Sequence, residues 1–216
     1  ANQFEAFDIK SDGSGGHASI SSCFYLLVKY ADVLPKSFVC PGDSGTTEFK
    51  LADTEADKKI LVDLWDFGRF AFEHCSYTYH MPFSLYPLTT ACEPGMAVAA
   101  DRNPWIRSPA ARAKQFPDNF TFEGDRKTIK AGNSISHEQE GQNVLFLDNH
   151  VNFEKSSFCG INNDNIYTYS YNFEGIRMFE SGPGDPLDST DSLLIHDQPA
   201  GGEPRPTRGP KGEYSK

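Results

Sequence analysis

Residues 143–153 read NVLFLDNHVNF. Two runs rich in β-forming residues flank the pair Asp148 and Asn149. Both of these residues tolerate the positive φ that a tight two-residue turn requires, and the pattern is typical of a β-hairpin. The sequence therefore predicts two antiparallel strands, at residues 143–147 and 150–153, which fold back on each other at Asp148 and Asn149.

The segments around the hairpin predict helices and further strands. Between residues 19 and 31 apolar residues recur at three- and four-residue steps, which indicates an amphipathic helix whose buried face consists of Ile20, Cys23, Phe24, Leu27 and Val28. A second helix is predicted at residues 56–65, where acidic residues stand near the start. Runs that are apolar or rich in β-forming residues predict strands at residues 76–81, 96–100 and 166–171, and a short strand or extended segment at residues 37–41.

The order of these elements predicts an α+β fold, in which an N-terminal helix packs on an antiparallel sheet, with long loops and a flexible C-terminal tail. Residues 108–130 are polar and interrupted by proline and glycine, so they predict a long loop with at most one helical turn. Only Leu193, Leu194 and Ile195 in the tail are expected to dock on the body. Composition divides the chain into a flexible lead-in, a globular head and an extended or disordered tail, at residues 1–16, 17–180 and 181–216.

Charge and hydropathy narrow the classes of function. The chain has 216 residues and a formal net charge of −10, so most of its surface would repel a phosphate backbone, and nucleic acid is not an expected partner. No apolar run approaches the roughly 18–20 residues that span a bilayer, which predicts a soluble chain. The five cysteines show neither CxxC spacing nor a CxxCH haem site, which argues against zinc ribbons and c-type haem.

The segment from His137 to Val151 reads HEQEGQNVLFLDNHV. It resembles the C-terminal signature of the bacterial prepilin-type processing-associated family, in which a His is followed by nine residues and then Asp-Gly, inside a G-x-N-V-L-F-x-D-G-H-V string. Here ten residues separate His137 from Asp148, and Asn149 replaces the glycine. Asn is the next-best residue at positive φ, so the hairpin is expected to survive that replacement. The segments 38–44 and 75–80 are similar to two further elements of the family.

The resemblance implies the soluble head of a type II pseudopilin-like protein. Members of the family carry an N-terminal prepilin peptide and a membrane-spanning helix, which this sequence lacks, so contact with a membrane is expected only through that absent helix. The expected location is the bacterial cell envelope, on its periplasmic or extracellular face. The expected function is that of a non-enzymatic structural subunit or surface-displayed head of a type II secretion or pilus-like assembly, acting through protein partners or self-assembly. Four aromatic residues are candidates for contacts with a partner if they are exposed, and belong to the core if they are buried: Trp65, Phe67, Phe70 and Phe72.

The resemblance also bears on the cysteines. Cys40 and Cys75 each begin or end a predicted strand, and both fall in segments similar to family elements, so they form the first candidate disulfide. In the chain-entropy model such a bridge would contribute about 3–4.5 kcal/mol. The alternative is two separate buried thiols. A second bridge would come from Cys23, Cys92 and Cys159, and spacing does not decide which two of them pair.

Two groups of histidines offer a different class of function. His137, Asp148 and His150 would suit a metal-dependent hydrolase, or a carbohydrate-binding module at the cell surface, since two imidazoles and a carboxylate can hold a catalytic zinc ion. The other interpretation is that His137 caps or hydrogen-bonds the hairpin formed by residues 143–153, which contains Asn143, Asp148, Asn149 and His150, and so fixes its register. His74 and His80 lie on either side of Cys75 and are an even number of residues apart in the sequence. This spacing is compatible with a two-histidine metal site or, alternatively, with two histidines that are solvated or hydrogen-bonded.

An oxygen-rich loop follows Cys159 and Gly160. Asn162, Asn163 and Asp164 could wrap a hard cation through side-chain and backbone oxygens, which predicts calcium as the cofactor if there is one. Major pseudopilins hold calcium in a late loop, so the resemblance supports this prediction. The alternative is a turn whose Asn residues are explained by their tolerance of left-handed φ.

Overall fold

The chain folds into a mixture of helices and antiparallel sheet, which is an α+β fold as predicted. The computed structural model describes residues 19–53, 60–68, 70–106, 109, 120–122, 124–173, 176–180 and 186–197. Five strands form the main sheet in the order β4-β3-β2-β1-β7, and β5 pairs with β6 in a separate two-stranded sheet. The strands are β1 Tyr77–His80, β2 Ala97–Asp101, β3 Gln142–Phe146, β4 Val151–Glu154, β5 Tyr169–Phe173, β6 Ile176–Glu180 and β7 Leu194–Ile195.

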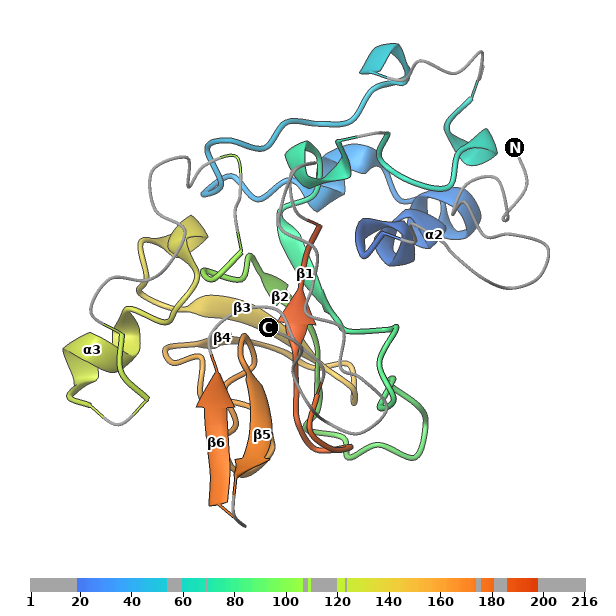
Figure 1. Ribbon diagram of the computed structural model, residues 1–216. Coiled ribbons are helices and arrows are strands. Elements are labelled where there is room, and N and C mark those ends of the chain that lie inside the picture. The colour runs from blue at the N-terminus through green and yellow to red at the C-terminus, as the bar shows by residue number, and fades with distance from the viewer. Residues whose placement is uncertain are drawn as a thin grey trace, which may run out of the picture.

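The helices are few and short compared with the loops. The two α-helices in the described ranges are α2 Ser21–Ala31 and α3 Arg126–Lys130. Single turns of 3-10 helix lie at Pro35–Phe38, Leu51–Asp53, Leu61–Asp63, Ala71–Glu73, Ile135–His137 and Ile161–Asn163. In Figure 1 the blue helix α2 and the orange β5–β6 ribbon lie on opposite sides of the main sheet as viewed. None of the helices in these ranges has the length and apolar character that crossing a bilayer would take.

Helix α2 confirms the helix predicted at residues 19–31, but Leu27, which is predicted on its buried face, is 46% exposed. Its buried side chains Phe24, Tyr25 and Val28 pack into an aromatic cluster with Phe38, Phe49 and Phe67. The Asp197 carboxylate accepts hydrogen bonds from the backbone N–H groups of Ile20 and Ser21 at 2.8 and 2.9 Å, so a segment far along the chain satisfies the start of the helix. The helix ends at Ala31, and the next residue, Asp32, has a left-handed φ of 55°.

The predicted hairpin is present as β3 and β4, but its turn differs from the one expected. Asn149 has a φ of 70°, whereas Asp148 is not among the residues with positive φ. The Asn149 N–H donates to the carbonyl of Phe146 at 3.0 Å, and the Phe146 N–H donates to the carbonyl of His150 at 3.0 Å. This is a three-residue loop in which a turn is followed by one left-handed residue. Leu147 therefore belongs to the loop, because its N–H donates to Met96 instead of to β4.

This turn gives the first prediction. Replacing Asn149 by valine is expected to lower the free energy of unfolding by about 1–2 kcal/mol, because a β-branched residue is strained at positive φ. Replacing Asn149 by glycine is expected to leave stability equal or slightly higher. Urea unfolding followed by circular dichroism would measure both. Equal stability of the valine and glycine variants would contradict the assigned turn.

One of the predicted strands is corrected, and the segment predicted at residues 37–41 is extended only from Val39 onward. It forms no strand, because Pro35 opens a 3-10 turn that includes residues 37 and 38, and the Cys40 N–H donates to the Ser76 side chain at 3.0 Å instead of to a neighbouring strand. The strand expected from Ile166 begins only at Tyr169. The side-chain oxygen of Asn165 accepts a hydrogen bond from the Tyr167 N–H at 3.0 Å, which holds the preceding residues in a turn. The strands predicted at 76–81 and 96–100 are confirmed as β1 and β2.

The helix predicted at residues 56–65 is found only as the 3-10 turn Leu61–Asp63, and residues 54–59 lie outside the described ranges. Most of the loop predicted at residues 108–130 also lies outside the described ranges. The described end of this loop contains α3. The division of the chain at residues 16 and 180 stays a prediction, because residues 1–18 and most of 181–216 are not described.

The expected docking of Leu193, Leu194 and Ile195 is confirmed. These side chains are at most 1% exposed, and β7 pairs with the outer edge of β1. Two further backbone hydrogen bonds fix the start of β7, since the Met81 N–H donates to the carbonyl of Leu193 at 2.9 Å and the Leu194 N–H donates to the carbonyl of Ile166 at 2.7 Å. A short segment late in the chain thus completes the sheet.

Candidate functional site

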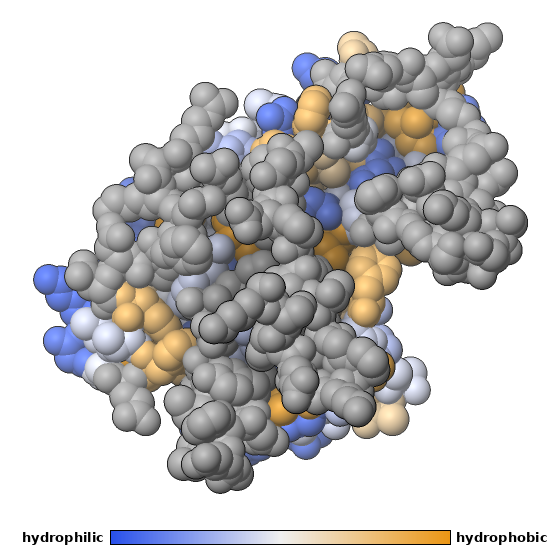
Figure 2. Space-filling view, viewed as in Figure 1, coloured by the Kyte–Doolittle hydropathy of each residue, from blue (hydrophilic) through white to orange (hydrophobic). Residues whose placement is uncertain are grey.

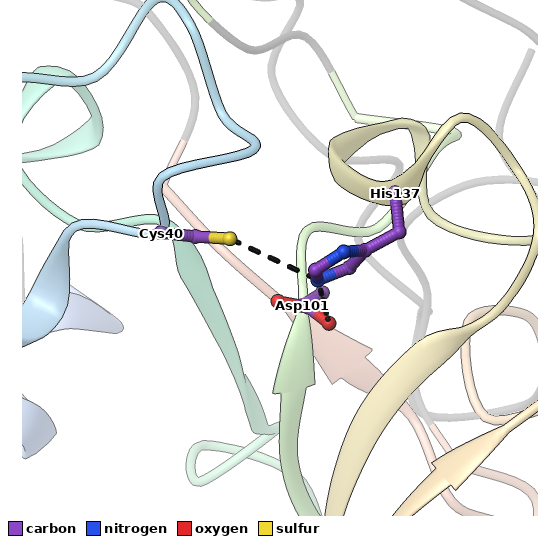
Figure 3. Close-up of side chains that lie close together, drawn as sticks. All are labelled: Cys40, Asp101 and His137. Carbon is purple, nitrogen blue, oxygen red and sulfur yellow. Dashed lines mark hydrogen bonds and ion pairs between the residues drawn. The ribbon is translucent and has the colours of Figure 1, made fainter.

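Three segments that are far apart in the sequence meet at the end of β2. They are the turn that contains Cys40, the last residue of the strand, Asp101, and the 3-10 turn that ends at His137. The Cys40 turn reaches this position because Gly42 lies directly against the backbone of Ser136, where an added Cβ would come within 2.1 Å of the carbonyl oxygen. Only glycine allows this close approach. Figure 3 shows the side chains of Cys40 and Asp101 converging on the His137 ring.

The distances define a compact group. His137 Nε2 lies 3.1 Å from Asp101 Oδ2 and 3.8 Å from Cys40 Sγ. One ligand-type atom from each of the three residues lies within 4.8 Å of the other two. The Asp101 side chain is 0% exposed and that of His137 is 29% exposed, so the group is buried on one side and open to solvent on the other.

Asn143 at the start of β3 holds the carboxylate in place. Its backbone N–H donates to Asp101 Oδ2 at 2.7 Å, and its side-chain amide lies 3.2 Å from the same oxygen. The amide nitrogen is also 3.3 Å from His137 Nε2, and the His137 ring packs edge to face on Phe153 of β4. Contact between His137 and the hairpin, one of the two interpretations of this residue, is therefore observed.

The electrostatics of the group keep the thiol protonated. Burial raises the pKa of the Cys40 thiol, and the Asp101 charge adds to this effect. Burial also raises the pKa of the Asp101 carboxyl, against the opposing effect of the Asn143 and His137 hydrogen bonds. In a cysteine–histidine–aspartate relay, the thiol and the carboxylate contact different ring nitrogens. Here both approach Nε2, so the arrangement does not suit activation of a nucleophile.

A second buried network fixes the Cys40 turn from the other side of β2. Arg102 Nε pairs with Asp43 Oδ2 at 2.5 Å, and both side chains are 1% exposed. An Arg102 terminal nitrogen also donates to Thr46 Oγ1 at 2.7 Å and to the carbonyl of Phe72. Although burial by itself raises the pKa of the Asp43 carboxyl, the charge and hydrogen bonds of Arg102 and the hydroxyl of Thr46 lower it below its ordinary value. The pair therefore stays ionised.

The metal site predicted from His137, Asp148 and His150 is not assembled. Asp148 Oδ1 and His150 Nδ1 contact each other at the exposed hairpin turn, and the His150 ring stacks on Phe146 with centroids 4.5 Å apart. His137 lies at the other end of β3, beside Asn143. The physical reason is the length of the strand, because five residues of extended chain span roughly 16 Å.

The predicted disulfide between Cys40 and Cys75 is also corrected. All five cysteines are free thiols. Cys40 Sγ faces His137, whereas Cys75 Sγ donates to the carbonyl of Tyr77 at 3.8 Å. Burial raises the pKa of Cys75 to about 12 and that of Cys159 to about 12, so both behave as structural thiols. His74 and His80 likewise have separate partners, the carbonyls of Thr47 and Tyr86.

The loop predicted to hold calcium has a clear local structure. Asn162 and Asn163 both have left-handed φ, at 57° and 60°, and both are exposed. Asp164 is 2% exposed, and its Oδ2 accepts a hydrogen bond from the backbone N–H of Ser192 at 2.8 Å. The carboxylate therefore links this loop to the segment that leads into β7. Calcium binding by Asn162, Asn163 and Asp164 stays a prediction.

Comparison with known protein families, curated proteins and solved structures found no match.

Proposed function

We propose that this chain is a non-enzymatic head domain that acts through protein contacts, as a pseudopilin-like subunit of a type II secretion or pilus-like assembly in the bacterial cell envelope. The observation that carries the proposal is an apolar stripe on the outer face of α2 and the residues after it. The stripe consists of Leu26, Leu27, Tyr30 and Leu34, which are 41%, 46%, 70% and 54% exposed.

The stripe lies opposite the face that builds the core. Phe24, Tyr25 and Val28 point into the aromatic cluster, whereas Leu26, Leu27 and Tyr30 follow at the offsets that place them on the other side of the helix. A helix that is apolar on two faces is costly to leave in water, and exposed apolar patches commonly mark protein contact sites. The stripe supports a second protein surface as its occupant.

Neighbouring aromatic residues extend the stripe. The Tyr30 ring packs edge to face on Trp65 with centroids 6.5 Å apart, and Lys29 Nζ lies 4.3 Å from the Trp65 ring centroid. Aromatic residues bordered by a cation are typical of protein interfaces. Of the other aromatic contact candidates, Phe67 is fully buried and belongs to the core, whereas Phe70 is 44% exposed. Figure 2 shows hydrophobic residues reaching the surface at several places between hydrophilic ones.

The arrangement of Cys40, Asp101 and His137 supports the non-enzymatic part of the proposal. The thiol is held protonated by burial, and the imidazole contacts the carboxylate and the thiol through the same nitrogen. Neither feature favours nucleophilic catalysis.

Photo-crosslinking in the cell that makes the protein tests the proposal. A photoreactive phenylalanine derivative at position 30 is expected to give covalent adducts with a second copy of the chain or with another envelope subunit. The same group at the exposed position 36, outside the stripe, is expected to give none. A Leu27→Asp substitution should reduce the adducts from position 30 at least tenfold without changing the circular dichroism spectrum. Equal adducts from positions 30 and 36, or none from position 30, would contradict the proposal.

A further inference from the structure

Three side chains of the kinds that bind transition metals converge at the end of β2, and this arrangement goes beyond a role in protein contacts. We infer that Cys40, Asp101 and His137 bind one divalent transition metal ion of the zinc class. The metal would displace the proton of the Cys40 thiol, and the ligands would be the resulting thiolate sulfur, one carboxylate oxygen and Nε2 of the imidazole. A water molecule would complete the coordination on the side where His137 reaches solvent.

The spacing of the ligand atoms fits a tetrahedral ion. Zinc–sulfur and zinc–nitrogen bonds of about 2.3 and 2.05 Å, at a tetrahedral angle, place the two ligand atoms about 3.6 Å apart. Nitrogen and oxygen ligands would be about 3.3 Å apart by the same geometry. The corresponding distances here are 3.8 Å from Cys40 Sγ to His137 Nε2, and 3.1 Å from His137 Nε2 to Asp101 Oδ2. Two of the three distances between ligand atoms are therefore within about 0.2 Å of the values for a tetrahedral ion, and the third, between Cys40 Sγ and an Asp101 oxygen, is at most 4.8 Å.

Hydrogen bonding alone leaves the group incompletely satisfied. His137 Nε2 carries either one proton or one lone pair, yet the Cys40 sulfur and an Asp101 oxygen both approach it. In addition, Asp101 Oδ1 is buried and has no hydrogen-bond partner among the described residues, so the charge of the carboxylate is only partly compensated. A cation held through Asp101 Oδ2 would compensate that charge and would satisfy the Cys40 sulfur and His137 Nε2 at the same time.

The surrounding residues supply the support that a metal site needs. Asn143 donates to the Asp101 carboxylate from its backbone at 2.7 Å and from its amide at 3.2 Å, which fixes the orientation of a ligand. The buried Arg102–Asp43 pair holds the turn that carries Cys40. A thiolate and a carboxylate would also neutralise the charge of a divalent ion in this half-buried position.

The set of ligands selects the class of ion. Calcium and magnesium prefer oxygen ligands only, whereas a thiolate with an imidazole favours zinc and similar transition metals. The site is distinct from the predicted calcium loop at Asn162–Asp164 and from the Asp148–His150 contact at the hairpin turn.

Metal titration of the purified chain tests the inference. After removal of metal under reducing conditions, one equivalent of zinc is expected to bind in competition with a chromophoric chelator. Cobalt(II) in place of zinc should give a thiolate-to-cobalt charge-transfer band. The Cys40→Ser and His137→Ala variants are each expected to bind zinc at least 100-fold more weakly, and Asn143→Ala about 10–100-fold more weakly.

Two matched controls make the result specific. Cys92→Ser removes a partly exposed thiol that is not a proposed ligand, and His150→Ala removes the imidazole of the hairpin turn. Both are expected to leave zinc affinity within twofold of the unmodified chain. Absence of the thiolate-to-cobalt band in the unmodified chain would overturn the inference, whether or not the ligand variants fold. Zinc binding that Cys40→Ser leaves unchanged would also overturn it and would identify the group as a hydrogen-bonded network only.

Discussion

Replacement of Arg102 by alanine is expected to lower the free energy of unfolding by about 3–5 kcal/mol, because it leaves one charge of a buried ion pair without its partner. Arg102 and Asp43 have side chains that are each 1% exposed, so water cannot replace the lost contact. The change would also free the hydroxyl of Thr46 and the carbonyl of Phe72, which accept hydrogen bonds from the guanidinium. Urea unfolding at neutral pH would measure the difference.

The double variant Asp43→Ala with Arg102→Ala separates the ion pair from the packing of the two side chains. It is expected to cost less than the sum of the two single variants, by about 0.5–3 kcal/mol, because the remaining charge is also removed. Lys130→Ala serves as a control, since the Lys130–Glu140 pair is exposed and should leave the unfolding midpoint nearly unchanged. Additive costs for Asp43 and Arg102 would show that they do not act as a pair.

The local parts of the fold could be predicted from the sequence. The β3–β4 hairpin and α2 follow from patterns within about a dozen neighbouring residues, and both are present. The turn was less predictable. Leu147 and Asp148 leave the hairpin because their N–H groups donate to Met96 and Pro94, some fifty residues away, and no local pattern encodes those partners.

The site at Cys40, Asp101 and His137 depends on contacts between residues that are even farther apart in the sequence. Cys40 and His137 are separated by 97 positions, and Arg102 and Asp43 by 59. Asp101 and Arg102 were missed as site residues, although a signal existed. Two charged residues directly follow the apolar run of β2, and charges at the end of a buried strand require partners. Such a pattern predicts that partners exist, but it does not identify them.

The carboxyl groups of Asp66 and Asp197 lie near the start of α2 and make the stability of the fold depend on pH. Burial raises the pKa of Asp66 to about 7, and the charge of Asp197 adds to this effect. Both carboxylates share the Ser21 hydroxyl, which lies 2.8 Å from Asp66 and 2.6 Å from Asp197. Because the folded-state pKa of Asp66 exceeds its ordinary value of 3.8, this group favours the folded state less as the pH rises from about 4 to 7.

His196 has the opposite dependence. Burial lowers its pKa from the ordinary value of 6.5 to about 3, and the Arg102 charge adds to this effect, whereas the Asp43 charge opposes it. The imidazole is 6% exposed, and its Nδ1 lies 2.9 Å from the carbonyl of Asp197. Between pH 6.5 and 3, His196 therefore binds a proton in the unfolded chain but not in the folded chain. The stability from His196 is complete above pH 6.5 and is lost as the pH falls toward 3.

The His196→Gln variant isolates this contribution, because glutamine stays neutral at every pH and all other groups are common to both proteins. The gap between the two pKa values of His196 corresponds to roughly 5 kcal/mol. The difference in unfolding free energy between the unmodified chain and His196→Gln should be constant above pH 6.5. It should then shift in favour of the variant as the pH falls toward 3. A difference that does not change with pH would mean that His196 is not held neutral in the fold. The predicted change with pH would show that His196, which senses the charges of Arg102 and Asp43, makes the fold sensitive to acid.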